Sequence, residues 1–525
     1  MVDSDDDSTD GAVVRVPVGS ANEGRARRLV DAAHDAAGGG VTVVETGPTG
    51  VDTSEPLVAL TAGGRTTLHG GLTPDGVRTL VEAAADGDLG AERARSSVEH
   101  DTETDAFPTP DTGPLSVGRR RVLARAGWTD PTGVEADEPF AADRAADAGD
   151  EVRERLAEVG LLGRGRGDGA PDTQVSEEWE VARRTDGDPV VVVNGNEADP
   201  RNDTDRLLLE SDPVAVLDGA LAVAELVGAD DVVVYLNEAD DLARRRVHGV
   251  VNAVADAVDA DHDTLPEIVA GPDRYIAGEP TMALESLEGN DRLEARLRPP
   301  TPARHGIYGR PTVIHTPRTL AQVRRAILSP EEYDPDDADP GTRLVSVTGD
   351  VDGSAVVEIP TGGSLATAAE AVGFEGNPKL AVVGGQFGGL TRTLDHPASA
   401  PGLRSADLGT AGVVELFDDG ACALAAVGRR ARFGEEENCG RCVPCREGSK
   451  QLTGMLRDIY DGEYRDAKLR ELARVARESS TCSFGRELAR TVLTGVDQFE
   501  NEFAAHAEGR CPAGECGSEG HEGHT

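Results

Sequence analysis

The sequence predicts a multidomain α/β protein that ends in a helical region. Two strongly apolar runs, PVVVVNGN and DVVVYLNE, flank a helical pattern that begins near Asp212. Such a strand–helix–strand pattern is typical of a parallel sheet covered by helices. From about residue 433 the apolar spacing becomes helical, and most of the cysteines lie in this last part. A length of 525 residues predicts two to four domains.

The elements follow one another in five segments before the C-terminal region. Residues 1–11 are expected to be a disordered acidic tip, and residues 12–86 form a compact α/β unit. Residues 87–115 are rich in Asp, Thr and Pro and predict a linker. Residues 116–335 hold the parallel sheet, and residues 336–432 predict short strands, turns and one helix. A helical domain over 433–508 and a loop-like Cys/His tail over 509–525 complete the chain.

The charge excludes several classes of partner. The chain has 96 acidic and 52 basic residues, a net charge of -44, and 38% hydrophobic residues. Such a negative chain is not expected to bind nucleic acid or an anionic membrane. An acid-rich, Lys-poor composition predicts a halophilic protein, because the Debye length is only about 3 Å at 1 M salt.

The sequence contains neither a membrane span nor a signal peptide. No apolar run approaches the length of about 18 residues that crosses a bilayer. The first ten residues are acidic and lack the basic and apolar regions of a secretory signal. We therefore expect a protein of a high-salt cytoplasm without direct membrane insertion, peripheral at most to a membrane complex.

The strongest chemical signal is a cysteine motif. Cys439, Cys442 and Cys445 form C-x2-C-x2-C, and Cys482 follows on a later predicted helix. Three thiolates on one loop and a fourth from a distant helix can hold a [4Fe–4S] cluster. A zinc site and unrelated thiols are the alternatives, although zinc sites seldom use three consecutive cysteines at this spacing.

These residues also carry a family resemblance. ENCGRCVPCREGSKQL followed by STCSFG resembles the cluster loop of the NADH-binding flavoprotein subunit of respiratory NADH dehydrogenase (complex I). The diaphorase subunits of NAD-linked hydrogenases and formate dehydrogenases are similar. VVVVNGNEADPRNDTDRLLLESDP, IAGEPTMALESLEG and LRPPTPARHGIYGRPTVIHTPRTLAQV resemble further segments of this family, in the same order. The resemblance covers about residues 115–516 and indicates a divergent, haloarchaeal-type member.

The resemblance implies a fold for each part. It implies a thioredoxin-like N-terminal domain, a Rossmann-like FMN-binding domain, a ubiquitin-like β-grasp module and a C-terminal helical bundle that carries the iron–sulfur cluster. Relatives hold a [2Fe–2S] cluster in the first domain. Here Pro17, Asn22, Pro48 and Asp52 stand at the four cysteine positions, so this cluster is not expected. A generic α/β domain is the alternative.

The resemblance also implies a flavin site. The loop GRGRG, from Gly163, resembles a Gly-Arg-Gly-Gly motif, and a flexible linker is the alternative. Glycines let the backbone approach a phosphate, and an Arg or a helix N-terminus stabilises it. The residues implied for FMN are Gly163, Arg164, Gly165, Asn194, Glu197, Gly278, Glu279, Thr281 and Thr319.

The positions implied for NADH are less well kept. Ala170 and Thr301 stand where the family stacks the nucleotide on phenylalanines, and Glu178 replaces the Lys before Trp179. Losing such a platform costs about 1–3 kcal/mol per ring by analogy with base stacking. Catalytic competence therefore stays open, and no individual catalytic residue is predicted.

The tail carries a second group of possible metal ligands. Cys511 and Cys516 lie in CPAGEC, which resembles the ending of the diaphorase branch. With His506 they are candidate zinc ligands, and His521 or His524 could join them. A free tail is the alternative, and no fourth ligand is evident. Cys422 is interpreted as a buried structural thiol.

Two hypotheses about function follow. The first is an NADH dehydrogenase-type oxidoreductase subunit that passes electrons from NADH through FMN to the [4Fe–4S] cluster and then to other redox subunits. The alternative is a degenerate, flavin-free or non-catalytic iron–sulfur and docking subunit. A flavoprotein with another donor, such as reduced ferredoxin, is a weaker third idea.

Overall fold

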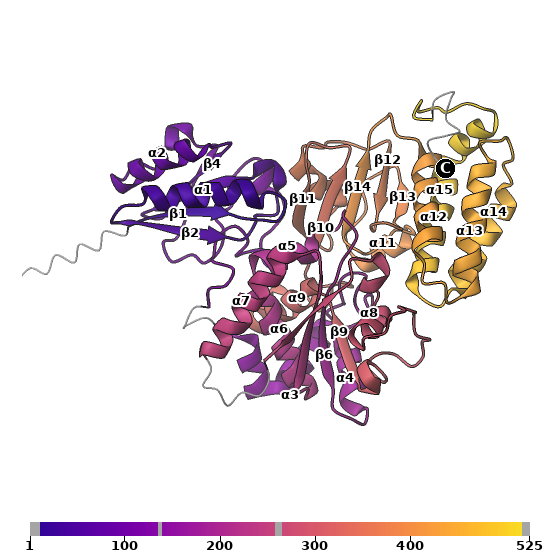
Figure 1. Ribbon diagram of the computed structural model, residues 1–525, viewed down its shortest axis with the longest axis horizontal. Helices are drawn as coiled ribbons and strands as arrows, with labels where there is room; N and C mark the ends of the chain where they lie inside the picture. Colours follow the sequence, from indigo (N-terminus) through magenta and orange to yellow (C-terminus); the bar gives the residue numbers. More distant parts are fainter. Residues whose placement is uncertain (1–10, 135–138, 258–264, 517–525) are drawn as a thin grey trace, which may run out of the picture.

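The computed structural model describes residues 11–134, 139–257 and 265–516. Their strands form three sheets of five, four and five strands. In Figure 1 the N-terminal sheet lies at one end of the molecule and a bundle of helices at the other, with the two remaining sheets between them. The prediction of a mixed α/β chain with a helical C-terminal region is confirmed.

The N-terminal sheet has the strand order β2-β1-β3-β4-β5. Its strands are β1 (Ala12–Pro17), β2 (Val41–Thr46), β3 (Leu57–Ala62), β4 (Arg65–Gly70) and β5 (Ser96–Glu99). The helices α1 (Glu23–Ala36) and α2 (Pro74–Ala85) pack against each other and bury Ala, Val and Leu side chains with the sheet. The predicted linker over 87–115 is therefore not a linker throughout, because β5 pairs with β4. This strand is short and polar, so the sequence gives little sign of it.

The N-terminal unit is joined to the rest of the chain by backbone contacts. Val356 N donates to Gly50 O at 2.6 Å, and Asp52 N donates to Ser354 O at 3.1 Å. A Cβ on Gly47 would lie 2.2 Å from Ser211 Cα. The loop that holds Asp52, one of the four positions without a cysteine, thus packs directly on the neighbouring units.

The second sheet is parallel, with the order β8-β7-β6-β9. It consists of β6 (Val190–Gly195), β7 (Asp231–Asn237), β8 (Glu267–Gly271) and β9 (Thr312–His315). Around it lie α3 (Ala141–Val159), α4 (Val175–Arg184), α5 (Thr204–Ser211), α6 (Pro213–Val227), α7 (Asp241–Ala257), α8 (Pro280–Leu287) and α9 (Pro317–Leu328).

The strand–helix–strand prediction is confirmed at β6, α6 and β7. Asp212 caps α6 by accepting from Ala215 N at 3.1 Å, and Gly228 ends it in a left-handed conformation. All six residues of β6 are buried, as expected for a strand covered on both faces. The carboxyl ends of β6 and β9 lie side by side, where ligands of open α/β sheets bind.

The third sheet has the order β11-β10-β14-β12-β13. Its strands are β10 (Thr342–Gly349), β11 (Ala355–Pro360), β12 (Leu380–Val383), β13 (Gly389–Thr391) and β14 (Val413–Phe417), with α10 (Leu365–Ala369) and α11 (Ala400–Ser405) between strands. Strands β10 and β14 pair in parallel, and the other pairs are antiparallel.

The C-terminal helices are α12 (Ala423–Glu437), α13 (Val443–Asp458), α14 (Asp466–Ser479) and α15 (Ser483–Ala507). The helical region thus begins before the predicted boundary at 433, because α12 packs against α13 and α15. Their shared core also contains Tyr275, Ile276, Ala277 and Met282 from the parallel-sheet unit. This shared core joins the carboxyl end of the parallel sheet to the helical bundle.

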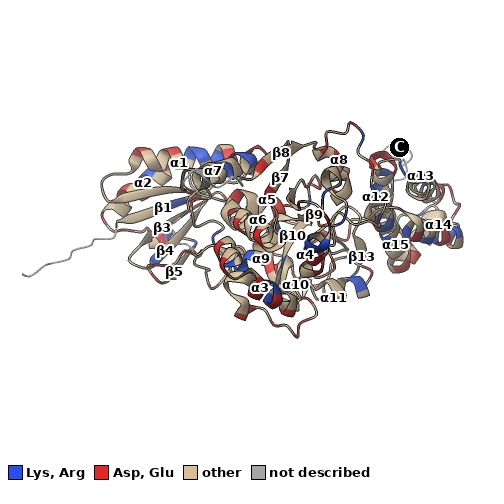
Figure 2. Cartoon of the chain, turned by 90° about the horizontal axis from the view of Figure 1, so that it is seen from below, with Lys and Arg blue, Asp and Glu red and all other residues tan. Residues whose placement is uncertain are grey.

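The surface charges are mixed along the helices. Figure 2 shows both acidic and basic positions on exposed helices such as α1 and α14. Pairs such as Arg27–Glu23 at 3.0 Å and Arg470–Asp466 at 2.7 Å follow the i, i+4 spacing. Within the described ranges, none of the helices has the combination of length and apolar character that crossing a membrane requires.

Candidate redox site

The four motif cysteines lie at the beginnings of two helices. Cys442 is the residue before α13, and Cys482 is the residue before α15. Cys445 is buried, the other three are half-buried, and all are free thiols. A helix N-terminus carries partial positive charge that stabilises a thiolate. The two helices therefore bring sequence-distant thiols together at a site suited to anionic sulfur.

The loop before α13 is held by its own hydrogen bonds. Asn438 Oδ1 accepts from Gly440 N at 3.0 Å, and Arg446 donates to Gly440 O at 2.8 Å. Arg446 also pairs with Glu447 at 3.0 Å, and Arg441 lies 3.5 Å from Glu294. The loop is thus ordered by contacts that leave the cysteine sulfurs free to bind a metal.

The pKa shifts of the thiols show that the four side chains lie close to one another. Burial, and then the charges of the other three thiolates, raise the pKa of Cys445. Burial and the nearby Glu279 carboxylate raise the pKa of Cys482 to about 12. Burial raises the pKa of Cys442 as well, but backbone N–H groups, Thr481 first, outweigh it and lower the value. Four thiolates this close require cations to neutralise them, which iron ions supply.

The residues implied for FMN come from four distant segments. Asn194 at the end of β6 donates from Nδ2 to Gly167 O at 2.8 Å and to Gly278 O at 3.1 Å. The structure thereby joins the loop 163–169, β6 and the short helix Tyr275–Gly278. We call the surface formed by 163–169, Asn194, Glu197 and Gly278 the flavin cradle.

Arg164 is part of the fold beneath the cradle. Its side chain is buried and pairs with Asp339 at 2.7 Å. It also donates to the backbone oxygens of Leu162, Pro340 and Thr342. The structure directs this guanidinium into an ion pair below the loop, whereas the sequence suggested a role at the phosphate. Its backbone N donates to Thr319 Oγ1 at 2.8 Å, so the loop contacts the first turn of α9.

The other residues implied for FMN make contacts within the protein at the edges of the flavin cradle. Glu279 caps α8 by accepting from Thr281 N at 2.9 Å and pairs with Arg298 at 3.1 Å. Thr319 Oγ1 donates to Asp168 Oδ2 at 2.9 Å. Gly163 N donates to Thr173 O at 3.2 Å, and Gly165 adopts φ +92°, which only glycine takes readily. These groups shape the site through its backbone.

Two buried oxygens in and beside the cradle lack hydrogen-bond partners in the described part of the chain. Within the described residues, Asn194 Oδ1 and Asn196 Oδ1 are buried without a hydrogen-bond partner. A buried acceptor without a donor costs free energy, on the order of 1–3 kcal/mol. The N–H and hydroxyl groups of FMN are donors of the kind that would satisfy them. The residues present therefore fit a flavin.

A buried cluster of one imidazole and two carboxyl side chains, from His315, Asp168 and Glu178, lies against the loop 163–169. His315 Nε2 accepts from Trp179 Nε1 at 2.8 Å, and its Nδ1 lies 3.6 Å from Asp168 Oδ1. Burial raises the pKa of Glu178 to about 7, against the opposing effect of the nearby His315 and Arg298. A Cβ on Gly169 would lie 2.5 Å from Glu178 Oε1, so this carboxyl lies against the loop backbone.

The tail forms a second cluster of ligands. One ligand atom from each of Cys422, His506, Cys511 and Cys516 lies within 4.8 Å of the others. His506 Nδ1 donates to Glu502 O at 2.6 Å, which leaves Nε2 facing Cys422 Sγ at 3.3 Å. His521 and His524 lie outside the described residues.

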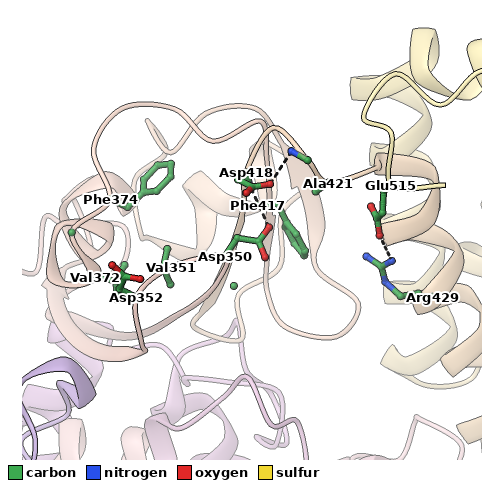
Figure 3. A pocket seen from close by; sticks show the side chains of 13 residues that line it. Asp350, Val351, Asp352, Val372, Phe374, Phe417, Asp418, Ala421, Arg429 and Glu515 are labelled. Atoms are coloured by element: carbon green, nitrogen blue, oxygen red, sulfur yellow. Dashed lines mark hydrogen bonds and ion pairs between the residues drawn. The ribbon is translucent and has the colours of Figure 1, made fainter. Parts of the chain in front are cut away.

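Glu515 ties this tail to α12. Its carboxylate accepts from Cys422 N and pairs with Arg429 at 2.7 Å. Glu515 and Arg429 line a cavity of about 670 Å³ between the third sheet and α12. Figure 3 shows Glu515 and Arg429 at one side of this cavity and Asp350 and Asp418 across it. The tail is therefore an ordered part of the helical bundle as far as Cys516.

Comparison with known proteins identifies the family. The family model described as the NADH-ubiquinone oxidoreductase-F iron-sulfur binding region matches residues 425–506, and the Nuo51 FMN-binding domain matches residues 156–325. The second NADH-quinone oxidoreductase F-subunit of Rhizobium meliloti (strain 1021) is 32% identical over 395 residues, which are 69% of this chain and 90% of that protein. The chain belongs to the NADH-quinone oxidoreductase F-subunit family.

Two further relatives extend the comparison. The NADP-reducing hydrogenase subunit HndC of Solidesulfovibrio fructosivorans is 28% identical over 389 residues, 70% of this chain and 78% of that protein. The crystal structure of an air-oxidised NAD+-reducing [NiFe]-hydrogenase matches with a TM-score of 0.64 and 23% identity, over 94% of this chain and 85% of the matched one. The second likeness shows a shared fold.

Membership of the F-subunit family confirms the predicted class. The chain carries the FMN-binding domain and the iron–sulfur binding region of an electron-transfer protein, and the four motif cysteines lie inside the matched iron–sulfur region. Sequence reasoning missed one residue that the structure brings into a site. Cys422 precedes α12, and only the fold places it beside the tail cysteines. Arg166 belongs to the predicted GRGRG loop, and the fold shows that its side chain pairs with Glu197 inside the flavin cradle.

Proposed function

We propose that this F-subunit homologue takes electrons from NADH and delivers them to other redox subunits of a dehydrogenase complex. FMN would bind in the flavin cradle, and a [4Fe–4S] cluster would bind Cys439, Cys442, Cys445 and Cys482. When bound, FMN converts the two-electron chemistry of a nicotinamide into single-electron transfer. The protein's part is to hold the two groups close together and to exclude water between them.

One observation carries this proposal: the cradle and the cysteines share a hydrophobic core. Tyr275, from the helix that ends at Gly278, packs edge-to-face on Phe484 with ring centroids 5.9 Å apart. Phe484 lies two positions after Cys482. Phe387 and Phe433 pack on the same tyrosine at 5.6 and 5.3 Å. A cluster of packed aromatic side chains therefore lies between the two sites, and it would limit the access of water to the path of electron transfer.

The test is the cofactor content of the full chain, purified without oxygen in concentrated KCl. About four iron atoms and one flavin per chain, with flavin bleaching on addition of NADH, are expected. Iron without flavin would favour the alternative, a flavin-free docking subunit. Glu178 beside the loop and the absence of aromatic rings at Ala170 and Thr301 favour that alternative. Bleaching by reduced ferredoxin but not NADH would indicate another donor.

The units of the fold support a division into domains. We infer a thioredoxin-like domain without a cluster from β2-β1-β3-β4-β5, and a Rossmann-like FMN domain from the parallel sheet. The sheet around the parallel pair β10–β14 supports a ubiquitin-like β-grasp module. Limited proteolysis within 100–115, after β5, tests the first boundary, since cleavage there should release an intact N-terminal fragment if the domain is independent.

The tail supports a zinc site. Three thiolates and one imidazole form a set that binds Zn²⁺ tetrahedrally, and Cys422 supplies the fourth ligand that the sequence did not reveal. Such a site would fix the end of α15 to the start of α12. Cys422→Ser is expected to lose about one zinc per chain and keep its iron. Loss of iron with zinc unchanged would contradict this assignment.

A further inference from the structure

Arg166 lies at the centre of the flavin cradle and joins two of its segments. Its side chain is 7% exposed, and its Nη2 pairs with Glu197 Oε1 at 2.9 Å. Its Nη1 donates to Tyr275 O at 3.0 Å. The guanidinium carbon lies 4.0 Å from the centroid of the Tyr275 ring. The Arg166 side chain thus covers both the Glu197 carboxylate and one face of the Tyr275 ring.

The same guanidinium covers Gly278. A Cβ on Gly278 would lie 2.8 Å from Arg166 Nη2 and 2.4 Å from Asn196 O. A glycine allows close approach of another group to the backbone, and here that group is Arg166. Three surfaces of the cradle, at Glu197, Tyr275 and Gly278, are therefore in contact with a single side chain.

The contact between Arg166 and Glu197 is a buried ion pair. Burial lowers the pKa of Arg166, but the charge and hydrogen bond of Glu197, together with the charges of Tyr275 and Glu487, raise it overall. Burial raises the pKa of Glu197, but the charge and hydrogen bond of Arg166, with the donor Asp199 N and the charge of Arg318, lower it overall. Glu487 of α15 also faces Arg166. The carboxylate of Glu197 has further donors in Asp199 N at 2.9 Å and Asn202 Nδ2 at 3.2 Å.

The neighbouring acceptors have no such partners. Asn194 Oδ1 and Asn196 Oδ1 are buried and lack a hydrogen bond within the described residues, although both asparagines shortly precede Glu197 in the chain. A buried acceptor without a donor is unfavourable. Acceptors without donors thus lie next to a guanidinium, that of Arg166, which already contacts Glu197, Tyr275 and Gly278.

We propose that Arg166 is a positioning residue whose contacts with Glu197, Tyr275 and Gly278 compete with FMN, so that it turns away from Glu197 and Gly278 when FMN binds. This inference rests on the proposed function, because it assumes that the cradle is the flavin site. FMN then binds only to the fraction of molecules in which Arg166 has turned away. The apparent affinity is reduced by that fraction.

The experiment is a titration of the flavin-free full chain with FMN in concentrated KCl, followed by quenching of flavin fluorescence. Arg166→Ala is expected to bind FMN about tenfold more tightly than the wild type, a difference of about 1.4 kcal/mol. Arg166→Lys should gain less, because an ammonium group still pairs with Glu197 but does not cover Tyr275 as a planar group.

Arg201→Ala is the matched control. Arg201 lies near the same strand end and pairs with Asp199 at 2.9 Å and Glu415 at 3.1 Å. Its removal also deletes an ion-paired arginine, and the affinity for FMN is expected to stay within about twofold, less than 0.5 kcal/mol. Circular dichroism shows whether Arg166→Ala is folded, since Glu197 is left without its cation. If it is unfolded, the comparison is made with Arg166→Lys.

The outcomes separate this inference from the proposed function. Equal or weaker FMN binding by the folded Arg166 variants, with wild-type binding intact, overturns the role of Arg166. Tighter binding by Arg166→Ala and not by Arg201→Ala supports it. If the wild type, the Arg166 variants and Arg201→Ala all fail to bind FMN, and the purified protein contains none, the proposed flavin site is wrong. The inference about Arg166 then fails with it.

Discussion

At the scale of single residues, the motif cysteines and the residues implied for FMN differ in whether their side chains are available to bind a cofactor. The four cysteine sulfurs are free, and their spacing and burial suit one metal cluster. In the cradle, by contrast, Arg164 supports the fold and Glu197 is already paired. Glu178 adds a buried carboxyl beside the loop, next to Asp168, His315 and Arg298.

Replacing Cys442 should remove the cluster and leave the tail site intact. Cys442→Ser replaces a thiolate ligand with a hydroxyl, so most of the iron is expected to be lost. Elemental analysis of iron and zinc in the same sample is the measurement, and Cys516→Ser is the matched control, expected to keep iron. Unchanged iron in Cys442→Ser would contradict the ligand assignment.

Glu178 should make stability depend on pH. Its pKa is raised from 4.5 to about 7, so the native state keeps a proton that the unfolded chain loses at lower pH. The stability it contributes when protonated is lost as pH rises from the unfolded value through about 7. Glu178→Gln should therefore raise the unfolding temperature at pH 8 by more than at pH 5, as measured by thermal unfolding monitored by circular dichroism. An equal effect at both values would mean that Glu178 ionises normally.

At the scale of elements, the start of α15 sets the geometry of the cluster site. Gly485 lies in its first turn, where a Cβ would be 2.3 Å from Ser480 Oγ and 3.0 Å from Cys445 Cβ. The helix can approach Cys445 this closely only because residue 485 has no side chain. The separation between Cys482 and Cys445 therefore depends on one glycine.

Gly485→Ala is expected to push α15 away from α13 and to lose more than half of the iron. Gly454→Ala is the control, because a Cβ there meets nothing within 4 Å in α13. It should keep its iron and gain about 0.5–1 kcal/mol from better helix propensity. Iron content and chemical unfolding of both variants are the measurements. Retention of iron by Gly485→Ala would show that the helix adjusts at no cost to the site.

At the scale of the whole molecule, the charge of -44 opposes folding. Short-range pairs such as Arg27–Glu23 and Arg470–Asp466 offset only part of this repulsion. The repulsion acts over the Debye length, which falls from about 10 Å at 0.1 M salt to about 3 Å at 1 M.

The unfolding temperature should therefore rise steadily as KCl is increased from about 0.1 M to 1 M and beyond. Differential scanning calorimetry is the measurement. Sucrose at matched osmolality is the control, since it favours compact states without screening charge. A salt response no larger than the sucrose response would mean that self-repulsion is not what limits stability.

The order of residues along the chain was enough to indicate the family and the succession of α/β and helical units, and to predict four cysteines as cluster ligands. These depend on local spacing, on apolar periodicity and on motifs that can be read along the chain. Other features depend on distant segments meeting, and they became visible only in the folded molecule. Folding placed Cys422 beside His506, directed Arg164 to Asp339 and Arg166 to Glu197, and paired the short strand β5 with β4. A side chain's partner in a folded core is set by packing, which no periodicity along the chain records.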